Sequence, residues 1–263
     1  MIVVKLPFWI APFEDKDLIR LGRNMDGGYS LNQKSLLEVT TLYSFGIGHD
    51  WTFEQDFLEF RKLNGLDSRI YAWDNRIGFS YFLKIGLRGL LKLPFGLIEI
   101  TDSKLRVNEF IQYCKMWKLS AQVKHIRETV SRHSIKSMKI PLKSYGIKMD
   151  IEGSEWPILR EKSEFLADAN FIVIELHSFG ENIYEFKYLL SWLEEYFWIS
   201  HLHVNNSGGL VSDVPNVIEL TLTSNRFPKP KKRVRNLPML KLDFPNNPQL
   251  PDFAIQFESQ RSN

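Results

Sequence analysis

The sequence has 263 residues, of which 44% are hydrophobic and 25% are charged. These proportions are typical of globular proteins and exclude disordered, collagen-like and coiled-coil classes. Lys and Arg together number 34 against 31 Asp and Glu, a surplus too small to indicate nucleic-acid binding. The single cysteine, Cys114, excludes an internal disulfide framework and a zinc site built from cysteines.

The chain carries no clear targeting segment. Its apolar N-terminus lacks a basic start and is interrupted by Pro7 and Pro12, so we expect no signal peptide. The longest apolar stretch, residues 79–100, contains cations that a membrane-spanning helix would place in hydrocarbon. We therefore expect a cytoplasmic protein without a transmembrane helix, peripheral to a membrane at most.

Short apolar runs alternate with longer helical patterns, which is typical of βαβ units and a parallel sheet. Strands are predicted at residues 41–45, 69–73, 121–126, 144–149, 171–176, 197–204 and 216–223. Helices are predicted at residues 52–64, 108–119 and 182–197. Thr52 is the expected N-cap residue of the first helix. The chain after Arg226 is rich in proline and asparagine, and we expect a tail with little regular structure there.

Three predicted strands end in residues suited to ligand binding: YSFGIGHD (43–50), YAWDN (71–75) and KMDIEGSE (148–155). In open α/β sheets, ligands bind at the carboxyl ends of the strands, beside the topological switch point. Gly46 and Gly48 allow a tight turn that approaches a ligand closely. Asp74, at the end of the next strand, can accept hydrogen bonds from two ribose hydroxyls. Together these residues favour a nucleoside-bearing cofactor over a purely structural turn.

The block IKMDIEGSEWPIL (147–159) resembles the signature of FkbM-type S-adenosylmethionine-dependent methyltransferases. Other blocks agree with this family in the same order: RLGRNMDGGYSL (20–31), SFGIGHDWTFEQDF (44–57), IVIELHS (172–178), HVNN (203–206), PNVIELTLT (215–223) and LDFPNNPQLPDFAIQF (242–257). The nearest resemblance is to a methyltransferase-like subgroup that shares the DGGY and KMDIEGSE blocks.

This resemblance implies a Rossmann-like class I methyltransferase fold of the α/β class. The expected sheet is seven-stranded and mostly parallel, is flanked by helices, and has an antiparallel last strand. The resemblance also implies one methyltransferase domain over residues 1–263, with a basic amphipathic insertion at about 79–120 and an extended tail from about 226.

S-adenosylmethionine is the cofactor that the resemblance implies. The residues expected to contact it are Gly46, Ile47, Gly48, Asp50, Asp74, Asn75 and Asp150. Asp50 stands where a third glycine of the turn would be, and its carboxylate could bind the amino group of the cofactor. The interval from Gly46 to Asp74 exceeds the roughly 20 residues of a dinucleotide fingerprint, which counts against NAD.

The acceptor that the resemblance implies is a sugar hydroxyl. Such a hydroxyl is a poor nucleophile at neutral pH and needs a general base or a divalent cation. In one mechanism His177 is the base, and Glu175 or Asp150 orients it. In the other, Asp150 and Glu175 bind Mg²⁺ or Mn²⁺, and His177 or His203 completes the shell. A purely structural role for Glu175 and His177 at the end of a strand is the third alternative.

Several further residues near these motifs have two interpretations each. Glu152 and Glu155 are either acids that complement a helix N-terminus or catalytic groups. The DGGY segment is either a turn near the cofactor mouth, involving Arg20, Asp26 and Tyr29, or a structural turn. Four aromatic residues flank the motifs and could form the wall of a pocket for adenine or sugar rings: Trp51, Phe53, Trp73 and Trp156.

Basic residues raise the question of partners. Lys84, Arg88 and Lys92 are spaced four apart, so they share one helix face that could contact anionic membrane or a phosphate-bearing glycolipid. A solvated face of a helix packed on the core is the alternative. The run KPKKRVR (229–235) lacks interleaved aromatic residues, so a nucleic-acid partner is not expected. The oligomeric state is not indicated.

The function that the resemblance implies is O-methylation of a sugar hydroxyl in a polysaccharide or glycolipid. Methylation of a small natural product on the same fold is one alternative. A catalytically inactive, cofactor-binding partner protein is another, although the presence of Asp74, Asp150, Glu175 and His177 argues against it.

Overall fold

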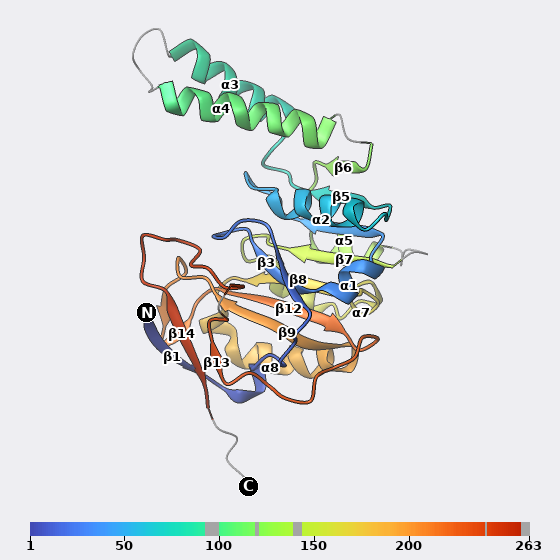
Figure 1. Cartoon of the computed structure of the whole chain (residues 1–263), viewed down its shortest axis with the longest axis vertical. Coiled ribbons are helices and arrows are strands. Elements are labelled where there is room, and N and C mark those ends of the chain that lie inside the picture. The colour runs from blue at the N-terminus through green and yellow to red at the C-terminus, as the bar shows by residue number, and fades with distance from the viewer. Residues whose placement is uncertain (93–99, 119–120, 139–143, 240, 259–263) are drawn as a thin grey trace.

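The computed structural model describes residues 1–92, 100–118, 121–138, 144–239 and 241–258 (Figure 1). Of residues 88–92, 100–106 and 118 it describes the backbone. Its centre is a seven-stranded sheet in the order β6-β5-β4-β7-β8-β12-β9.

The strands of this sheet are β4 (Thr41–Phe45), β5 (Arg69–Trp73), β6 (Val123–Ile126), β7 (Tyr145–Met149), β8 (Phe171–Leu176), β9 (Phe197–Val204) and β12 (Ile218–Ser224). Strands β4 to β8 are mutually parallel, whereas β12 runs antiparallel to both β8 and β9. The predicted fold class, a mostly parallel seven-stranded sheet with an antiparallel last strand and flanking helices, is confirmed.

The two faces of the sheet are covered by two separate hydrophobic clusters. Along β8, Ile172 and Ile174 belong to one cluster, whereas Phe171 and Val173 belong to the other. This alternation follows from the period of two in a strand, and it explains why β8 is apolar almost throughout. The long helices of the central domain are α2 (Thr52–Leu63) and α8 (Phe179–Tyr196), and the short ones are α1 (Gln33–Glu38), α5 (Arg132–Ser137), α6 (Glu155–Arg160) and α7 (Glu164–Ala167).

The strand order reverses at β4, which pairs with β5 on one side and with β7 on the other. The connections that leave β4 and β7 therefore diverge and leave room for a ligand between them. Gly46 follows β4 and Asp150 follows β7, so the two motifs predicted to bind the cofactor lie at this switch point.

The start of α2 differs from the prediction. Thr52 is the first helical residue and Trp51 is the N-cap, so the prediction of Thr52 as N-cap was wrong. The side chain of Asp50 explains the shift, because its Oδ1 accepts a hydrogen bond from Thr52 N at 3.0 Å and satisfies one of the free N–H groups of the first turn.

Two ends of the chain meet in a second sheet that the sequence did not reveal. Strand β1 (Ile2–Leu6) pairs in parallel with β14 (Phe253–Phe257), and β13 (Asn236–Leu237) pairs with β14 on its other side. The expectation of an irregular tail after Arg226 was therefore wrong for these strands. Two hairpins complete the sheets, β2 (Leu18–Leu21) with β3 (Tyr29–Asn32) and β10 (Leu210–Val211) with β11 (Val214–Pro215), and η1 (Phe8–Ile10) follows β1.

The predicted basic insertion begins with α3 (Phe79–Lys92) and continues in α4 (Ile100–Tyr113) and a π-helical turn, η3 (Cys114–Lys118). The two helices lie side by side and project from the β6 end of the sheet (Figure 1). Phe82 of α3 is fully buried and stacks on Tyr113 of α4 with ring centroids 4.7 Å apart, so the two helices pack against each other there. Lys84 is exposed, and the side chains of Arg88 and Lys92 lie outside the described residues. No helix in the described parts of the chain is long and apolar enough to cross a membrane.

Candidate active site

A cleft of about 480 Å³ opens beyond the carboxyl ends of β4, β5, β6 and β7. This volume lies within the range of small-molecule and cofactor sites. All seven residues that we expected to contact the cofactor line it: Gly46, Ile47, Gly48, Asp50, Asp74, Asn75 and Asp150. The switch point therefore gathers residues from three separate motifs around one space.

The glycine turn after β4 requires its glycines for different reasons. Gly46 has a φ of +78°, and a Cβ atom on it would lie 1.7 Å from the carbonyl oxygen of Asp150. Gly48 has a φ of +49°, and a Cβ atom there would meet nothing within 4 Å. Gly46 thus allows the ends of β4 and β7 to approach, and Gly48 borders open space in the cleft.

Asp74 holds this turn through its side chain. Its Oδ2 accepts hydrogen bonds from Gly48 N at 3.0 Å and Ile47 N at 3.3 Å. Its Oδ1 accepts from Arg76 N at 2.7 Å and Ile77 N at 3.1 Å. A carboxylate has about four lone-pair sites. A ribose hydroxyl would therefore share an oxygen with these N–H groups, and the ribose contact of Asp74 stays a prediction.

Asp50 is also engaged within the protein. Its Oδ2 lies 3.0 Å from Arg23 Nε, while its Oδ1 accepts from Thr52 N. The predicted contact with an amino group of the cofactor would place a second cation beside a carboxylate that Arg23 already neutralises. Because Arg23 is half exposed, this ion pair is exchangeable with solvent.

Lys148 is a cleft residue that the sequence analysis missed. It is 4% exposed, and its Nζ donates to Gly46 O at 2.9 Å and lies 3.6 Å from Glu54 Oε1. Burial alone would lower the pKa of Lys148, but Glu54 and Asp150 outweigh it and hold the pKa above its ordinary value. Lys148 and Asp150 are two residues apart, so alternation along β7 could have indicated that they share a face.

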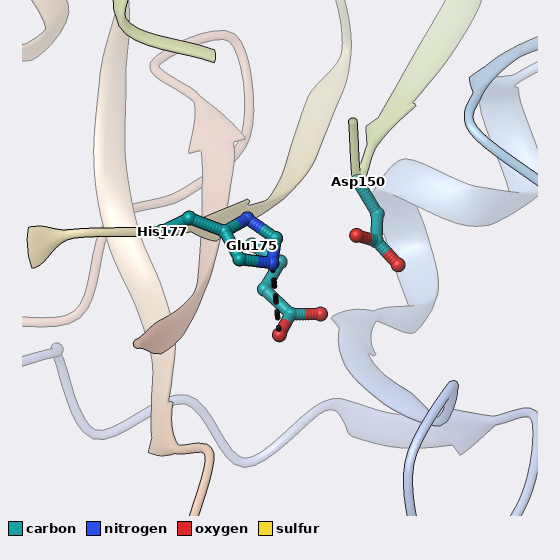
Figure 2. Close-up of side chains that lie close together, drawn as sticks. All are labelled: Asp150, Glu175 and His177. Carbon is teal, nitrogen blue, oxygen red and sulfur yellow. Dashed lines mark ion pairs between the residues drawn. The ribbon is translucent and has the colours of Figure 1, made fainter. Parts of the chain in front are cut away.

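The predicted catalytic residues come together beside the cleft. Asp150 follows β7, Glu175 lies near the end of β8, and His177 follows β8 (Figure 2). One ligand atom from each lies within 4.8 Å of the others, and His177 Nε2 is 3.9 Å from Glu175 Oε1. Adjacent parallel strands bring their ends to the same edge of the sheet, which is why residues far apart in the sequence meet here.

The two carboxyl groups of this cluster interact, and Glu175 is buried while Asp150 is partly buried. Burial raises the pKa of Asp150 to about 6, against opposing effects of Lys148 and His177. Burial, and then the charge of Asp150, raise the pKa of Glu175 well above its ordinary value. Glu175 accepts a hydrogen bond from Asn205 Nδ2 at 2.8 Å. The pair therefore holds a proton more readily than exposed carboxylates do, and a proton on Glu175 relieves the repulsion.

Tyr29 of the DGGY segment lies between these carboxylates. It is buried, and its hydroxyl is 3.4 Å from Asp150 Oδ2 and 3.5 Å from Glu175 Oε2. Since a phenol has one proton, it donates to one carboxylate at a time. Asp26 and Gly27 of the same segment line the cleft, which agrees with a turn near the cofactor mouth rather than a remote structural one.

His177 is held by a carboxylate that we had not expected in this role. Its Nδ1 lies 3.1 Å from Glu155 Oε1, and its Nε2 lies 3.6 Å from Glu152 Oε2. Burial alone would lower the pKa of His177, but the hydrogen bond to Glu155 and the nearby acids outweigh it and raise the pKa. We had predicted Glu175 or Asp150 as the orienting group, whereas the side chain at Nδ1 is that of Glu155.

His203, the other predicted metal ligand, is set apart from this cluster. Strand β12 lies between β8 and β9, and its Glu219 faces Glu175 on one side and His203 on the other. His203 Nδ1 lies 3.1 Å from Glu219 Oε2. Among the described residues, the histidine whose ring comes within 4.8 Å of both Asp150 and Glu175 is His177.

Only part of the predicted aromatic wall is present. Trp73 lines the cleft, whereas Trp51, Phe53 and Trp156 are buried away from it. Trp51 packs against Phe82, with ring centroids 5.5 Å apart. Trp156 donates a hydrogen bond from Nε1 to the carbonyl oxygen of His177 at 2.6 Å, so it contacts the backbone of the cluster rather than the cleft. The prediction of a pocket wall was wrong for these three residues.

The sequence motifs also did not indicate the part of the cleft wall that follows β6. Glu128, Thr129 and Val130 line it, and Asn75 Nδ2 donates to Thr129 Oγ1 at 2.5 Å. These residues come shortly after β6, so the rule that ligands bind at carboxyl ends of strands could have found them. No motif drew attention to this segment.

Comparisons with known proteins agree with the motifs. The family model described as Methyltransferase FkbM domain matches residues 114–197. None of the curated proteins matches this sequence.

Three similar solved structures show how distant the likeness is. One is a putative class I S-adenosylmethionine-dependent methyltransferase from Listeria monocytogenes, with 7% identity over 76% of this chain and 60% of that chain and a TM-score of 0.42. A putative RNA methyltransferase from Pyrococcus horikoshii has 10% identity over 73% of this chain and 80% of that chain, with a TM-score of 0.38. A dimethyladenosine transferase from Plasmodium falciparum has 10% identity over 73% and 61%, also with a TM-score of 0.38. Likeness this distant says nothing about the substrate.

The matched region includes β7, the KMDIEGSE block, β8 and the residues Asp150, Glu175 and His177. The methyltransferase class that the sequence motifs indicated is thereby confirmed. Residues 114–197 of this chain are thus similar to the Methyltransferase FkbM domain.

Proposed function

We propose that this protein is an S-adenosylmethionine-dependent O-methyltransferase that methylates a sugar hydroxyl of a polysaccharide or glycolipid. The observation that carries the proposal is the cluster of Asp150, Glu175 and His177 beside the cleft, in which Glu175 is buried and the other two are partly buried. It combines an imidazole with two carboxyl groups whose pKa values burial raises, and such groups can accept and hold the proton of a hydroxyl.

The cleft fits the proposed cofactor. It has a volume of about 480 Å³, and the open space beside Gly48 lets a ligand approach the backbone. Asp50, Asp74 and Asn75 line the cleft; in the proposed complex Asp74 and Asn75 hold ribose hydroxyls and Asp50 holds an amino group, each in addition to its contacts within the protein. Lys148 brings a buried cation to the same wall, where it suits a carboxylate. Bound there, S-adenosylmethionine would supply a methyl group on a positively charged sulfur.

The cluster would handle the proton of the acceptor. The acceptor oxygen would take the methyl group that bound S-adenosylmethionine supplies, and the electron pair of the methyl–sulfur bond would stay with the cofactor. The hydroxyl proton passes to Nε2 of His177, the ring nitrogen that does not contact Glu155. Glu155, Asp150 and Glu152 favour the resulting imidazolium, as the raised pKa of His177 indicates.

A polyhydroxyl acceptor would find several polar groups near the cluster. Asn205 donates to Glu175 at 2.8 Å, and Asn246 donates to Asp26 at 3.0 Å and to Glu219 at 2.5 Å. Carboxylates and amides are suited to hydroxyl groups, since they accept and donate hydrogen bonds. The choice of a sugar over a small natural product rests on the family resemblance.

Metal-assisted transfer is a second candidate, favoured by one observation. Ligand atoms of Asp150, Glu175 and His177 lie within 4.8 Å of one another. Two carboxylates suit Mg²⁺ or Mn²⁺, and such an ion would lower the pKa of an acceptor hydroxyl. The contact between Glu155 and the second nitrogen of His177 also fits a ligating histidine.

The test is a transfer assay with S-adenosylmethionine carrying a tritiated methyl group. The acceptors are a panel of glycans, lipid-linked sugars and small hydroxylated compounds. We expect label in a glycan or lipid-linked sugar, and loss of transfer in His177→Ala with cofactor binding retained. Label confined to small compounds would favour the natural-product alternative. Cofactor binding without transfer to any acceptor would favour an inactive partner protein.

A further inference from the structure

Glu155 is a fully buried carboxylate outside the cleft lining. It is the first residue of α6, and its exposed fraction is 0%. Its Oε1 accepts a hydrogen bond from Ile151 N at 2.9 Å and lies 3.1 Å from His177 Nδ1. Its Oε2 has no hydrogen-bond partner in the described parts of the chain. A buried carboxyl group is unfavourable unless hydrogen bonds satisfy it. The hydrogen bonds that Glu155 makes here are those of its Oε1 with Ile151 N and His177 Nδ1.

The chemistry of this contact determines where the imidazole carries its hydrogen. Oε1 of Glu155 already accepts the hydrogen bond from Ile151 N, so this oxygen acts as an acceptor and Nδ1 of His177 is the donor to it. A neutral imidazole then has a free lone pair on Nε2. That atom lies 3.9 Å from Glu175 Oε1 and 3.6 Å from Glu152 Oε2, on the side of the carboxyl cluster.

The second bond of Glu155 fixes the geometry of the pair. Ile151 directly follows Asp150, so the bond from Ile151 N ties Glu155 to the turn that carries Asp150. Through Glu155, His177 of the neighbouring strand end is therefore held at a set place relative to Asp150. Trp156 Nε1 fastens the carbonyl of His177 from the same helix, at 2.6 Å.

From this geometry we infer that Glu155 is a positioning residue for the reaction proposed above: it keeps the hydrogen of His177 on Nδ1 and presents Nε2 to Asp150 and Glu175. The inference rests on the proposed function in one respect: the free lone pair on Nε2 of His177 matters for catalysis only if His177 accepts the proton of the acceptor hydroxyl. The inference applies equally if His177 binds a metal ion, because ligation also requires a free lone pair on Nε2.

The first test reads the tautomer and needs no acceptor. The protein is labelled with ¹⁵N at histidine, His177 is assigned by comparison with His177→Ala, and spectra are recorded at a pH at which the ring is neutral. We expect the Nδ1–H tautomer in the natural protein. In Glu155→Ala the ring should shift towards Nε2–H, because its acceptor is gone. A natural protein with the Nε2–H tautomer would overturn the inference.

The second test separates positioning from folding by kinetics. Glu155→Gln keeps the volume and an acceptor oxygen but removes the charge, whereas Glu155→Ala removes both. We expect kcat to fall by about 10- to 100-fold in Glu155→Ala and by less in Glu155→Gln, with the KM for the cofactor changed less than about twofold. If Glu155→Ala does not fold, Glu155→Gln decides alone, and an unchanged kcat there counts against the inference.

The matched control is Glu161→Gln at the C-terminal end of the same helix. Glu161 lies 3.9 Å from Arg132 and from Lys136 and does not contact the cluster. Its substitution should leave both the tautomer and kcat unchanged, and equal losses in both variants would overturn the positioning role. If the natural protein transfers no methyl group to any acceptor, the proposed function fails, while the tautomer spectra still decide what Glu155 does to His177.

Discussion

Replacing Asp150 by Asn should make the protein more stable while abolishing its activity. Burial raises the pKa of Asp150 from 3.8 to about 6, so the folded protein binds this proton more tightly than the unfolded chain does. The ionised form is therefore disfavoured in the fold. The resulting cost is absent below both pKa values, grows as the pH rises from about 4 to about 6, and is constant above that. Asparagine keeps the shape and removes the charge, so it removes the cost.

The size of the effect follows from the two pKa values. At pH 8 the cost amounts to about 3 kcal/mol, since each tenfold change in proton affinity is worth about 1.4 kcal/mol. At pH 5 it should be about half as large, because the unfolded carboxyl is mostly ionised there and the folded one is not. Removal of the charge should also eliminate methyl transfer if the proposed function is correct, because Asp150 belongs to the cluster that we propose accepts the proton of the acceptor.

Urea denaturation at pH 5 and pH 8, in buffer with EDTA, measures the gain. The matched control is Asp74→Asn, whose carboxylate accepts hydrogen bonds from four backbone N–H groups. An amide nitrogen in place of one oxygen cannot accept them, so this variant should lose about 1–3 kcal/mol. The reasoning is refuted if Asp150→Asn is less stable than the natural protein at pH 8, or if its gain does not grow with pH.

Four further outcomes are expected. In calorimetry, Asp74→Ala should weaken S-adenosylmethionine binding by about tenfold or more, since the glycine turn loses its acceptor, and an unchanged affinity would remove Asp74 from the cofactor site. Gly46→Ala should lower the free energy of unfolding by at least about 1–3 kcal/mol, because its φ is +78° and its Cβ would overlap Asp150 O; a urea midpoint like that of the natural protein would contradict this. The kcat should rise with pH through the raised pKa of His177 and then level off, as the neutral imidazole becomes the major form, so a rate that falls over this range would exclude His177 as the base. Thorough chelation with EDTA should leave the rate unchanged if His177 is the base, whereas loss of activity that Mg²⁺ or Mn²⁺ restores would establish the metal mechanism instead.

The sequence by itself predicted the features that depend on neighbouring residues. Alternating apolar runs marked the strands of the central sheet, and the predicted limits of β4, β5, β8 and β9 agree with the structure. Glycines and acids directly after β4, β5 and β7 predicted the cofactor cleft, because a residue that follows a parallel strand always lies at the same edge of the sheet. That rule needs no knowledge of which strands are adjacent.

The tertiary structure decided which side chains meet. The insertion of β12 between β8 and β9 puts Glu219 between Glu175 and His203, and so leaves His177 as the histidine of the cluster. The pairing of β1 with β14 joins the two ends of the chain. A local sequence pattern can predict a strand, but it cannot predict that the strand pairs with another so far away in the sequence. Tyr29 likewise reaches the two carboxylates from a separate hairpin.

Glu155 illustrates the difference most directly. Its place in the first turn of a helix was readable from the sequence, and there an acid is favoured whether or not it has another role. Only the packing of α6 against the end of β8 brings its carboxylate to His177 and buries it completely. Charge and hydrogen-bonding capacity are properties of the residue, but burial and the identity of the partner arise from the fold, and these two give the site its chemistry.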